Sequence, residues 1–368
     1  MSATATESAG EGRSLQLSCP RCAAPLRWDP DADALTCGHC EQRVEVPRGE
    51  AVIYEYPYEA RAQAREGFDL PVRHTRCTRC GAEVSFDQNA LAKECCFCGS
   101  PQVLEEASLR RTLRPESVIP LDVGRGTVEL KFRQWVGSRW FAPRALSKTR
   151  EFRAVGVYVP FWTFDARADS QWTAEAGHYY YVPVTRTVMI NGKLTTRVHM
   201  EQRVRWEPAA GARQDAYDDW LIHASRGLSV ELSAKLGRYD LSKLVPYKPD
   251  YLAGWSAEEY AIGLDDACQN FLAGVRAEQR RRCSGDVPGD TQRNLQVRTH
   301  IHEVYFKHVL LPVWSLTYQW RGQSYAVLIH GQTGHVVGKA PVSWVKVLLL
   351  VVLVLLGIGL VALLASRS

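Results

Sequence analysis

Cys19-Pro-Arg-Cys22 and Cys37-Gly-His-Cys40 lie near the start of this 368-residue chain, and Cys77-Thr-Arg-Cys80 and Cys95-Cys-Phe-Cys98 repeat their spacing 58 residues later. Both halves read C-x2-C-x14-C-x2-C. A tetrahedral Zn(II) ion takes four thiolate ligands, and each CxxC turn brings two of them together. The repeat therefore predicts two tandem zinc ribbons, with the ligands Cys19, Cys22, Cys37 and Cys40 in the first and Cys77, Cys80, Cys95 and Cys98 in the second.

Two other uses of these cysteines fit the sequence less well. Disulfide frameworks are typical of short secreted chains, whereas residues 1–12 form a polar leader without the apolar stretch of a signal peptide. A thioredoxin-like pair needs one CxxC in a βαβ setting. Cys96 offers an alternative sulfur in the second ribbon, but the register of the repeat favours Cys95 and Cys98.

We expect the cofactor content to be two structural Zn(II) ions. Each ribbon is too short to bury a core of its own, so metal binding would supply its folding free energy, about 10–16 kcal/mol in zinc-finger peptides. Four sulfur ligands leave no open coordination position for water or substrate, which argues against zinc catalysis.

An apolar segment, Val347–Ala365, lies near the C-terminal end and contains no charged residue. As a helix it would span about 29 Å, close to the hydrocarbon thickness of a bilayer, and we predict a transmembrane helix at 344–365. Lys339 and Lys346 precede the span and Arg367 follows it, which favours a cytoplasmic N-terminal side, as does the reducing environment that thiolates need. The expected location is the inner or plasma membrane, single-pass, with the bulk of the chain cytoplasmic.

About 240 residues between the ribbons and this segment predict a mixed antiparallel α+β body. Helices are expected at Gly126–Phe141 and at Ser256–Arg282, where Ser256 and Glu259 would form a capping box. Asn191-Gly192 between two β-rich runs predicts a hairpin. The other expected strands are Ala154–Phe164, Gln296–Phe306, Val313–Trp320 and Ser324–His330. The expected parts are a disordered leader (1–14), zinc ribbon 1 (15–48), a linker (49–72), zinc ribbon 2 (73–104), the α+β domain (105–343), the transmembrane helix (344–365) and a short tail (366–368).

The charge distribution weakens the case for a nucleic-acid partner. Residues 1–106 contain 11 Lys and Arg against 17 Asp and Glu, while the whole chain is +5. A ribbon that binds DNA or RNA would bring a basic surface to the phosphates. The basic segment Arg110–Arg153 has two interpretations: an interfacial helix with Trp135 and Trp140 inserted into anionic lipid, or, as we favour, an ordinary helix that packs its aromatic face on the body.

The sequence contains no recognisable catalytic arrangement, so we expect a protein that is not an enzyme. Cys283 follows three arginines but has no base marked beside it. His300 and His302 share one face of an expected strand, where a half-exposed polar face explains them best. No Walker A sequence is present, and no GxGxxG follows a strand. An enzyme with a site in the body is the least favoured alternative.

Three stretches, Val159–Ala166, Val245–Tyr260 and Ile329–Gly338, resemble signatures of a bacterial family of double-zinc-ribbon, tail-anchored membrane proteins. Members are commonly labelled "TFIIB-type zinc ribbon-containing protein", and sometimes "primosomal protein N′-like" or "DNA helicase", although this chain has no nucleotide-binding motif. The resemblance implies a membrane-bound recruitment factor, in a membrane-stress system with SPFH-domain or PspA-like partners. It covers nearly the whole chain and matches all eight expected zinc ligands.

These observations favour a non-enzymatic, membrane-anchored adaptor whose zinc ribbons dock other proteins. We expect protein partners at the ribbons and the membrane at the C-terminal helix, and we expect neither nucleic acid nor a small-molecule substrate. The alternative is a membrane-tethered nucleic-acid-binding protein that uses the ribbons or Arg110–Arg153, whose affinity would fall steeply with salt.

Overall fold

Strands dominate the computed structural model, which describes residues 17–47, 52–67, 72–87, 95–101, 103–106, 112–143, 145–146, 152–190 and 193–365. The α-helices are α1 (Arg125–Gly137), α2 (Val230–Leu236), α3 (Leu264–Asp286) and α4 (Trp344–Ala365). The mixed α+β class is therefore confirmed. The leader 1–14, the pair Asn191-Gly192 and the tail 366–368 lie outside the described residues.

Two sheets organise these residues. The smaller is β1 (Leu26–Asp29), β2 (Ala34–Cys37) and β3 (Arg43–Val44). The larger contains β4 (Tyr56–Pro57), β5 (Val72–Cys77), β6 (Glu83–Asp87), β7 (Val103–Glu106), β8 (Ser117–Val118), β9 (Phe152–Ile190), β10 (Lys193–His223), β11 (Val245–Pro246), β12 (Ser256–Glu258), β13 (Thr291–Trp320), β14 (Gln323–His330) and β15 (Val336–Gly338). Short 3-10 helices are η1 (Tyr58–Gln63), η3 (Leu241–Lys243) and η4 (Pro249–Leu252).

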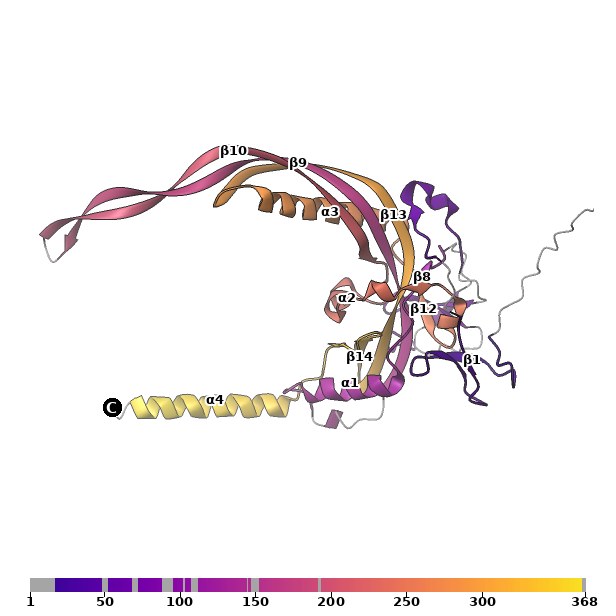
Figure 1. Cartoon of the computed structure of the whole chain (residues 1–368). Coiled ribbons are helices and arrows are strands. Elements are labelled where there is room, and N and C mark those ends of the chain that lie inside the picture. The colour runs from indigo at the N-terminus through magenta and orange to yellow at the C-terminus, as the bar shows by residue number, and fades with distance from the viewer. Residues whose placement is uncertain are drawn as a thin grey trace, which may run out of the picture.

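Strands β9, β10 and β13 form a long arch (Figure 1). β9 is the shared strand: it pairs antiparallel with β13 from Phe152 to Gly177 and with β10 from Phe161 to Ile190. The expected hairpin is confirmed, because β10 begins three positions after β9 ends. The two expected strands Gln296–Phe306 and Val313–Trp320 are parts of one strand, β13, because Pro312 does not interrupt the pairing.

Two β-bulges bend the arch at one level of β9. β10 is irregular between Tyr217 and Trp220, and β13 between His302 and Tyr305, so the extra residues lie on both sides of Asp165–Arg167. Asp219 and Glu303, within these bulges, have positive φ of 51° each. Bulges increase local twist and bending, which explains why the arch turns where it leaves the body.

Helix α3 supports the concave side of the arch (Figure 1). Its Phe271 stacks on Phe164 of β9 at 5.0 Å between ring centroids, and its buried Gln279 accepts a hydrogen bond from Ser170 at 3.0 Å. The expected capping box is wrong: α3 begins at Leu264, and Ser256 belongs to the buried strand β12 between β6 and β9. Pairing on both edges of β12 overrides the local helix-start signal.

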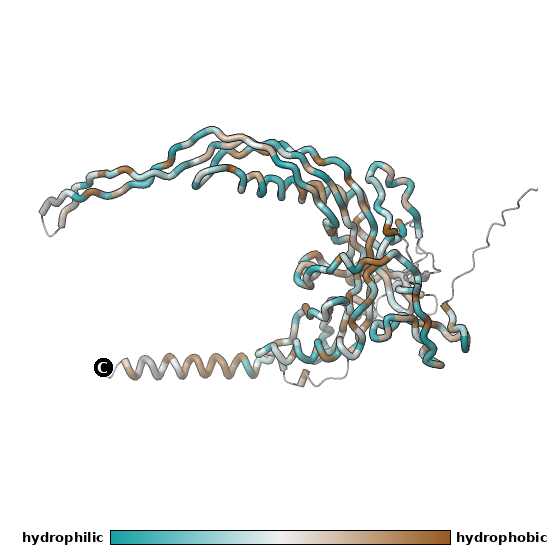
Figure 2. The backbone as a smooth tube through the Cα atoms, in the orientation of Figure 1, coloured by the Kyte–Doolittle hydropathy of each residue, from teal (hydrophilic) through white to brown (hydrophobic). Residues whose placement is uncertain are grey.

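Helix α4 carries the apolar C-terminal segment, whose coloured parts are mostly hydrophobic in Figure 2. Its side chains are described for 344–359 and 364–365, and most are exposed to solvent, with Leu353 at 65%. Counted over described residues alone, no helix is long and apolar enough to cross a membrane. The transmembrane expectation therefore stays a prediction.

Candidate metal centres

The eight predicted cysteines form two separate groups of four sulfurs. In the first group the Sγ–Sγ distances are 3.5 Å for Cys19–Cys40 and Cys22–Cys37 and 3.4 Å for Cys22–Cys40. In the second they are 3.6 Å for Cys77–Cys98 and Cys80–Cys95. A tetrahedral ion with 2.3 Å bonds to sulfur needs about 3.8 Å between ligands, whereas a disulfide needs about 2.05 Å. Both groups therefore fit one metal ion each.

All four CxxC knuckles have the same backbone geometry. The N–H four residues after the first cysteine donates to that cysteine's carbonyl at 2.8–3.0 Å, and the cysteine's own N–H donates to the carbonyl five residues on at 2.8–2.9 Å. The residue directly after the second cysteine has a positive φ in every knuckle. These residues are Ala23 (57°), Glu41 (58°), Gly81 (76°) and Gly99 (66°). Ribbon 2 uses glycine in this left-handed conformation, while ribbon 1 strains two ordinary residues.

The electrostatics of each group also call for a cation. The N–H groups of Cys40 and His39 lower the pKa of Cys37 to about 6. In contrast, burial and the neighbouring sulfurs outweigh a hydrogen bond from Ala24 and raise the pKa of Cys22 to about 12. Four thiolates this close repel one another, so they can all be anionic only around a positive ion.

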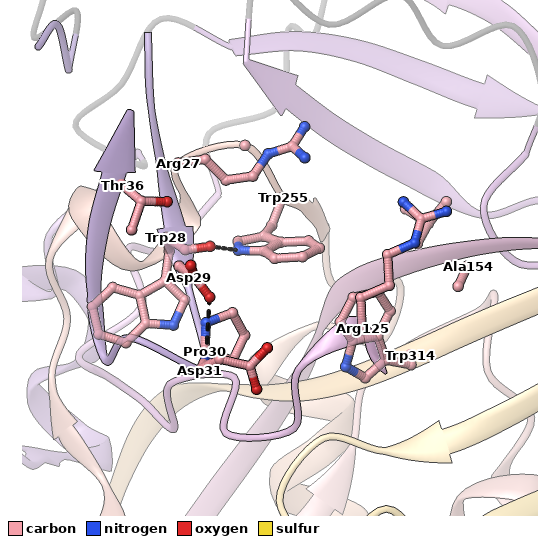
Figure 3. A pocket seen from close by; sticks show the side chains of 12 residues that line it. Arg27, Trp28, Asp29, Pro30, Asp31, Thr36, Arg125, Ala154, Trp255 and Trp314 are labelled. Carbon is pink, nitrogen blue, oxygen red and sulfur yellow. Dashed lines mark hydrogen bonds between the residues drawn. The ribbon is translucent and has the colours of Figure 1, made fainter. Parts of the chain in front are cut away.

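Ribbon 1 packs against the body through Trp28 (Figure 3). The buried indole Nε1 of Trp28 donates to the Leu121 carbonyl at 3.2 Å, and the Trp28 carbonyl accepts from Trp255 Nε1 at 3.0 Å. A pocket of about 320 Å³ lies along this seam, with Arg27 on one side and Arg125 on the other. The ribbon is therefore packed against the body.

Ribbon 2 is part of the larger sheet. β6 pairs with β12, which pairs with β9, and Cys77, Cys95 and Phe97 join the core formed by the body strands. Phe97 lies against Gly227, where a Cβ would come within 2.4 Å of its ring. Buried Glu258 holds this loop by accepting from the N–H groups of Arg226 at 3.0 Å and Gly227 at 2.7 Å. The second group of sulfurs is thus built into the body.

The remaining candidates from the sequence do not converge. Cys96 is buried beside Cys95 but is not among the grouped sulfurs, and a hydrogen bond to Cys95, together with burial, raises its pKa. Cys283 is buried against Trp172, and burial raises its thiol pKa, the opposite of an activated nucleophile. His300 and His302 stack at 5.4 Å, but no three-ligand group among the described residues includes either of them.

A half-buried acidic cluster at the bend was not predicted from the sequence. Ligand oxygens of Glu55, Asp165 and Asp219 lie within 4.8 Å of one another. Lys307 fills the centre: its Nζ is 2.5 Å from Glu55 and 2.6 Å from Asp219, and the side chain is buried. Asp165 accepts the N–H of Asp219 at 2.6 Å, which satisfies the backbone of the bulge. The lysine supplies the cation here, so the cluster braces the bend.

The end of the β9–β10 hairpin is a second feature that was not predicted from the sequence. Beyond Gly177 no third strand among the described residues pairs with β9 or β10, because β13 pairs with β9 only as far as Gly177 (Figure 1). Alternate side chains separate into two faces. The described residues of one face are uncharged: Tyr179, Tyr181, Pro183, Thr185, Thr187, Met189, Thr196, Val198, Met200, Gln202 and Val204. The other face carries Arg186, Arg197, Arg203 and Arg205 beside Glu201. Period-2 alternation in the sequence could have revealed this separation.

Fold and site together define an α+β protein with two tetracysteine centres. The chain is 27% identical over 343 residues to the uncharacterized protein YdjG of Bacillus subtilis (strain 168), an alignment that covers 90% of this chain and 92% of that protein. No family model and no solved structure matches the chain. Membership of the zinc-ribbon family stays a prediction.

The left-handed residues give a test of the knuckle geometry. Gly99→Ala should weaken ribbon 2 by about 1 kcal/mol, because the left-handed conformation disfavours a Cβ, while Ala23→Gly should strengthen ribbon 1 by a similar amount. Resistance to metal loss in a chelator titration measures both effects. Gly38→Ala is the control, since that glycine has ordinary φ and open space around it. Equal shifts in all three variants would contradict the assignment.

The grouping of sulfurs predicts the metal content. We expect two metal ions per full-length chain, one per chain in Cys95→Ser, and two in Cys96→Ser, because only Cys95 lies in a four-sulfur group. Inductively coupled plasma mass spectrometry of the purified proteins measures this directly. Loss of metal from Cys96→Ser with retention in Cys95→Ser would reverse the ligand assignment.

The bend should be sensitive to pH. Burial and then the hydrogen bond to Glu55 raise the pKa of Asp165 from 3.8 to about 7. The folded state therefore binds this proton more tightly than the unfolded state, and the stability contributed by this group falls as pH rises between those values. Asp165→Asn keeps an acceptor for Asp219 but cannot ionise. It should raise the melting temperature at pH 7.5 more than at pH 5, whereas the exposed control Asp218→Asn should change neither.

Proposed function

We propose that the protein is a non-enzymatic, membrane-anchored adaptor that recruits protein partners at the cytoplasmic face of the membrane. The observation that carries this proposal is the unsupported end of the β9–β10 hairpin. An isolated two-stranded hairpin is marginally stable in water. The end of the β9–β10 hairpin exposes an uncharged face to solvent, on which Tyr181 is 59% and Met200 is 53% exposed. Such a surface suits contact with another protein better than catalysis.

The metal centres serve this function as structural elements. We assign Zn(II) to both, because four thiolates at tetrahedral spacing match its preferred coordination and leave no position open for a substrate. The ribbons are packed into the body, so they would hold the root of the arch rigid instead of swinging as separate docking modules. Their exposed surfaces remain available as part of the partner site.

Anchoring by α4 completes the proposal. Its described side chains from Val347 to Gly359 are all apolar and lack a polar face, which is costly in water and favourable in lipid. Full-length protein in native membranes should resist extraction at alkaline pH. Release into the soluble fraction under those conditions would refute the anchor.

Nucleic-acid binding is the second candidate, and the arginine-bearing face of the hairpin favours it. A two-stranded β-ribbon can enter the major groove of DNA. However, Glu201 lies 3.8 Å from Arg186 and 3.7 Å from Arg203, and Glu207 lies 2.9 Å from Arg205, so carboxylates already pair with this face. We therefore rank it below the adaptor.

Site-specific photocrosslinking distinguishes these candidates. A photoreactive phenylalanine at Tyr181 should crosslink in cells to one protein partner, because Tyr181 lies on the uncharged face. The same residue at Tyr180, which is also exposed but lies on the opposite face, is the matched control. Met200→Glu should abolish the crosslink from position 181. Crosslinks to nucleic acid, or equal protein crosslinks from both positions, would contradict the adaptor proposal.

A further inference from the structure

The start of α4 is fastened to the loop that follows α1. Ser343 N donates to the Phe141 carbonyl at 2.8 Å, and Lys346 Nζ donates to the carbonyls of Trp140 at 2.8 Å and Ala142 at 2.7 Å. These three bonds fix the first turn of α4 against residues 140–142. These bonds therefore fix the position of α4 relative to α1, and the space between the two helices has a defined shape.

A groove of about 620 Å³ lies between the C-terminal end of α1 and the first turns of α4. Its apolar walls are Val136 and Pro143 on one side and Leu349, Leu350 and Leu353 on the other. The three leucines remain 43–65% exposed, so the described residues leave much of this wall uncovered. The groove continues directly onto the apolar surface of α4.

Two cations, Arg139 and Lys346, lie at the edge of the groove, and the described residues that line it include no carboxylate. The Arg139 guanidinium lies 4.9 Å from the Trp135 ring centroid, and no acidic side chain in the described part of the chain pairs with it. Lys346 uses two of its three N–H donors on carbonyls. One donor of Lys346 and the guanidinium of Arg139 are left to bind an anion.

Exposed tryptophans mark the same place. Trp140 and Trp344 are each 76% exposed, whereas the neighbouring Trp135 is buried. Tryptophan is enriched where protein meets the boundary between lipid and water. The interpretation in which Trp135 and Trp140 both insert into lipid therefore fits only one of them. Trp135 packs on the body, and Trp140 faces outward beside α4.

We propose that this groove binds one anionic phospholipid. An acyl chain lies along Leu349, Leu350 and Leu353, and the phosphate is held between Arg139 and Lys346. The charge of the site and its continuity with α4 select this occupant, since an apolar slot with cations at its mouth matches an amphipathic anion. The inference rests on the proposed membrane anchor and adds the class of lipid that the anchor prefers.

Native mass spectrometry of the full-length protein in mild detergent tests this. With equal amounts of phosphatidylglycerol and phosphatidylcholine, the wild type should retain one phosphatidylglycerol with about 30-fold preference, because each of the two basic groups contributes roughly 1 kcal/mol. Arg139→Gln should lower the preference about 5-fold, the share of one basic group, and Leu350→Trp should reduce retention of both lipids. Inorganic phosphate should not displace the lipid, because it has no acyl chain.

Arg133→Gln is the matched control, because Arg133 lies on α1 but pairs with Glu129 at 3.7 Å. It should behave as wild type, and two metal ions in every variant would show that folding is intact. Equal retention of both lipids by the wild type, or an unchanged preference in Arg139→Gln, would overturn the proposal. A dimer that Leu350→Trp dissociates would show instead that the groove binds a second copy. Crosslinking at Tyr181 tests the adaptor function separately, so the adaptor proposal and the phospholipid proposal can each fail without the other.

Discussion

Backbone pairing along β9 is the constraint on which the other parts of the structure depend. β10, β12 and β13 all hydrogen-bond to this strand, and through β12 it also carries the second ribbon. Its inward side chains from Trp162 to Ala174 form the surface on which α3 packs. One strand therefore sets the position of a metal centre, a supporting helix and an exposed hairpin relative to one another.

The bend in β9 shows how polar groups are accommodated inside this sheet. Each bulge removes regular pairing, and an unpaired buried N–H is costly. Asp165 satisfies the Asp219 N–H, and Lys307 compensates the charges that this solution gathers. Removing Lys307 would leave three half-buried acidic side chains together without a cation, so the cluster acts as a unit.

The sequence predicted the features that are encoded locally. The spacing of CxxC pairs foretold both groups of sulfurs, and Asn191-Gly192 foretold the hairpin. Local signals failed where distant contacts dominate: Ser256 resembles a helix cap, but β6 and β9 draw it into a strand. The acidic cluster unites residues of three strands, β9, β10 and β13, with Glu55 just before β4, and no spacing rule connects Glu55 with Lys307. The seating of both ribbons likewise depends on long-range partners such as Trp28 and Trp255.

The unpaired length of the hairpin also makes the arch a mechanical element. A pull at the end of the hairpin runs along the strands, so it loads the hydrogen bonds between β9 and β13 in shear and shares the force among them. The load passes through the braced bend and ends where β12 and β6 connect β9 to the second ribbon. Tension applied far from the body would thus reach a tetracysteine centre, and a metal ion bound there would cross-link the chain at the point where the force arrives.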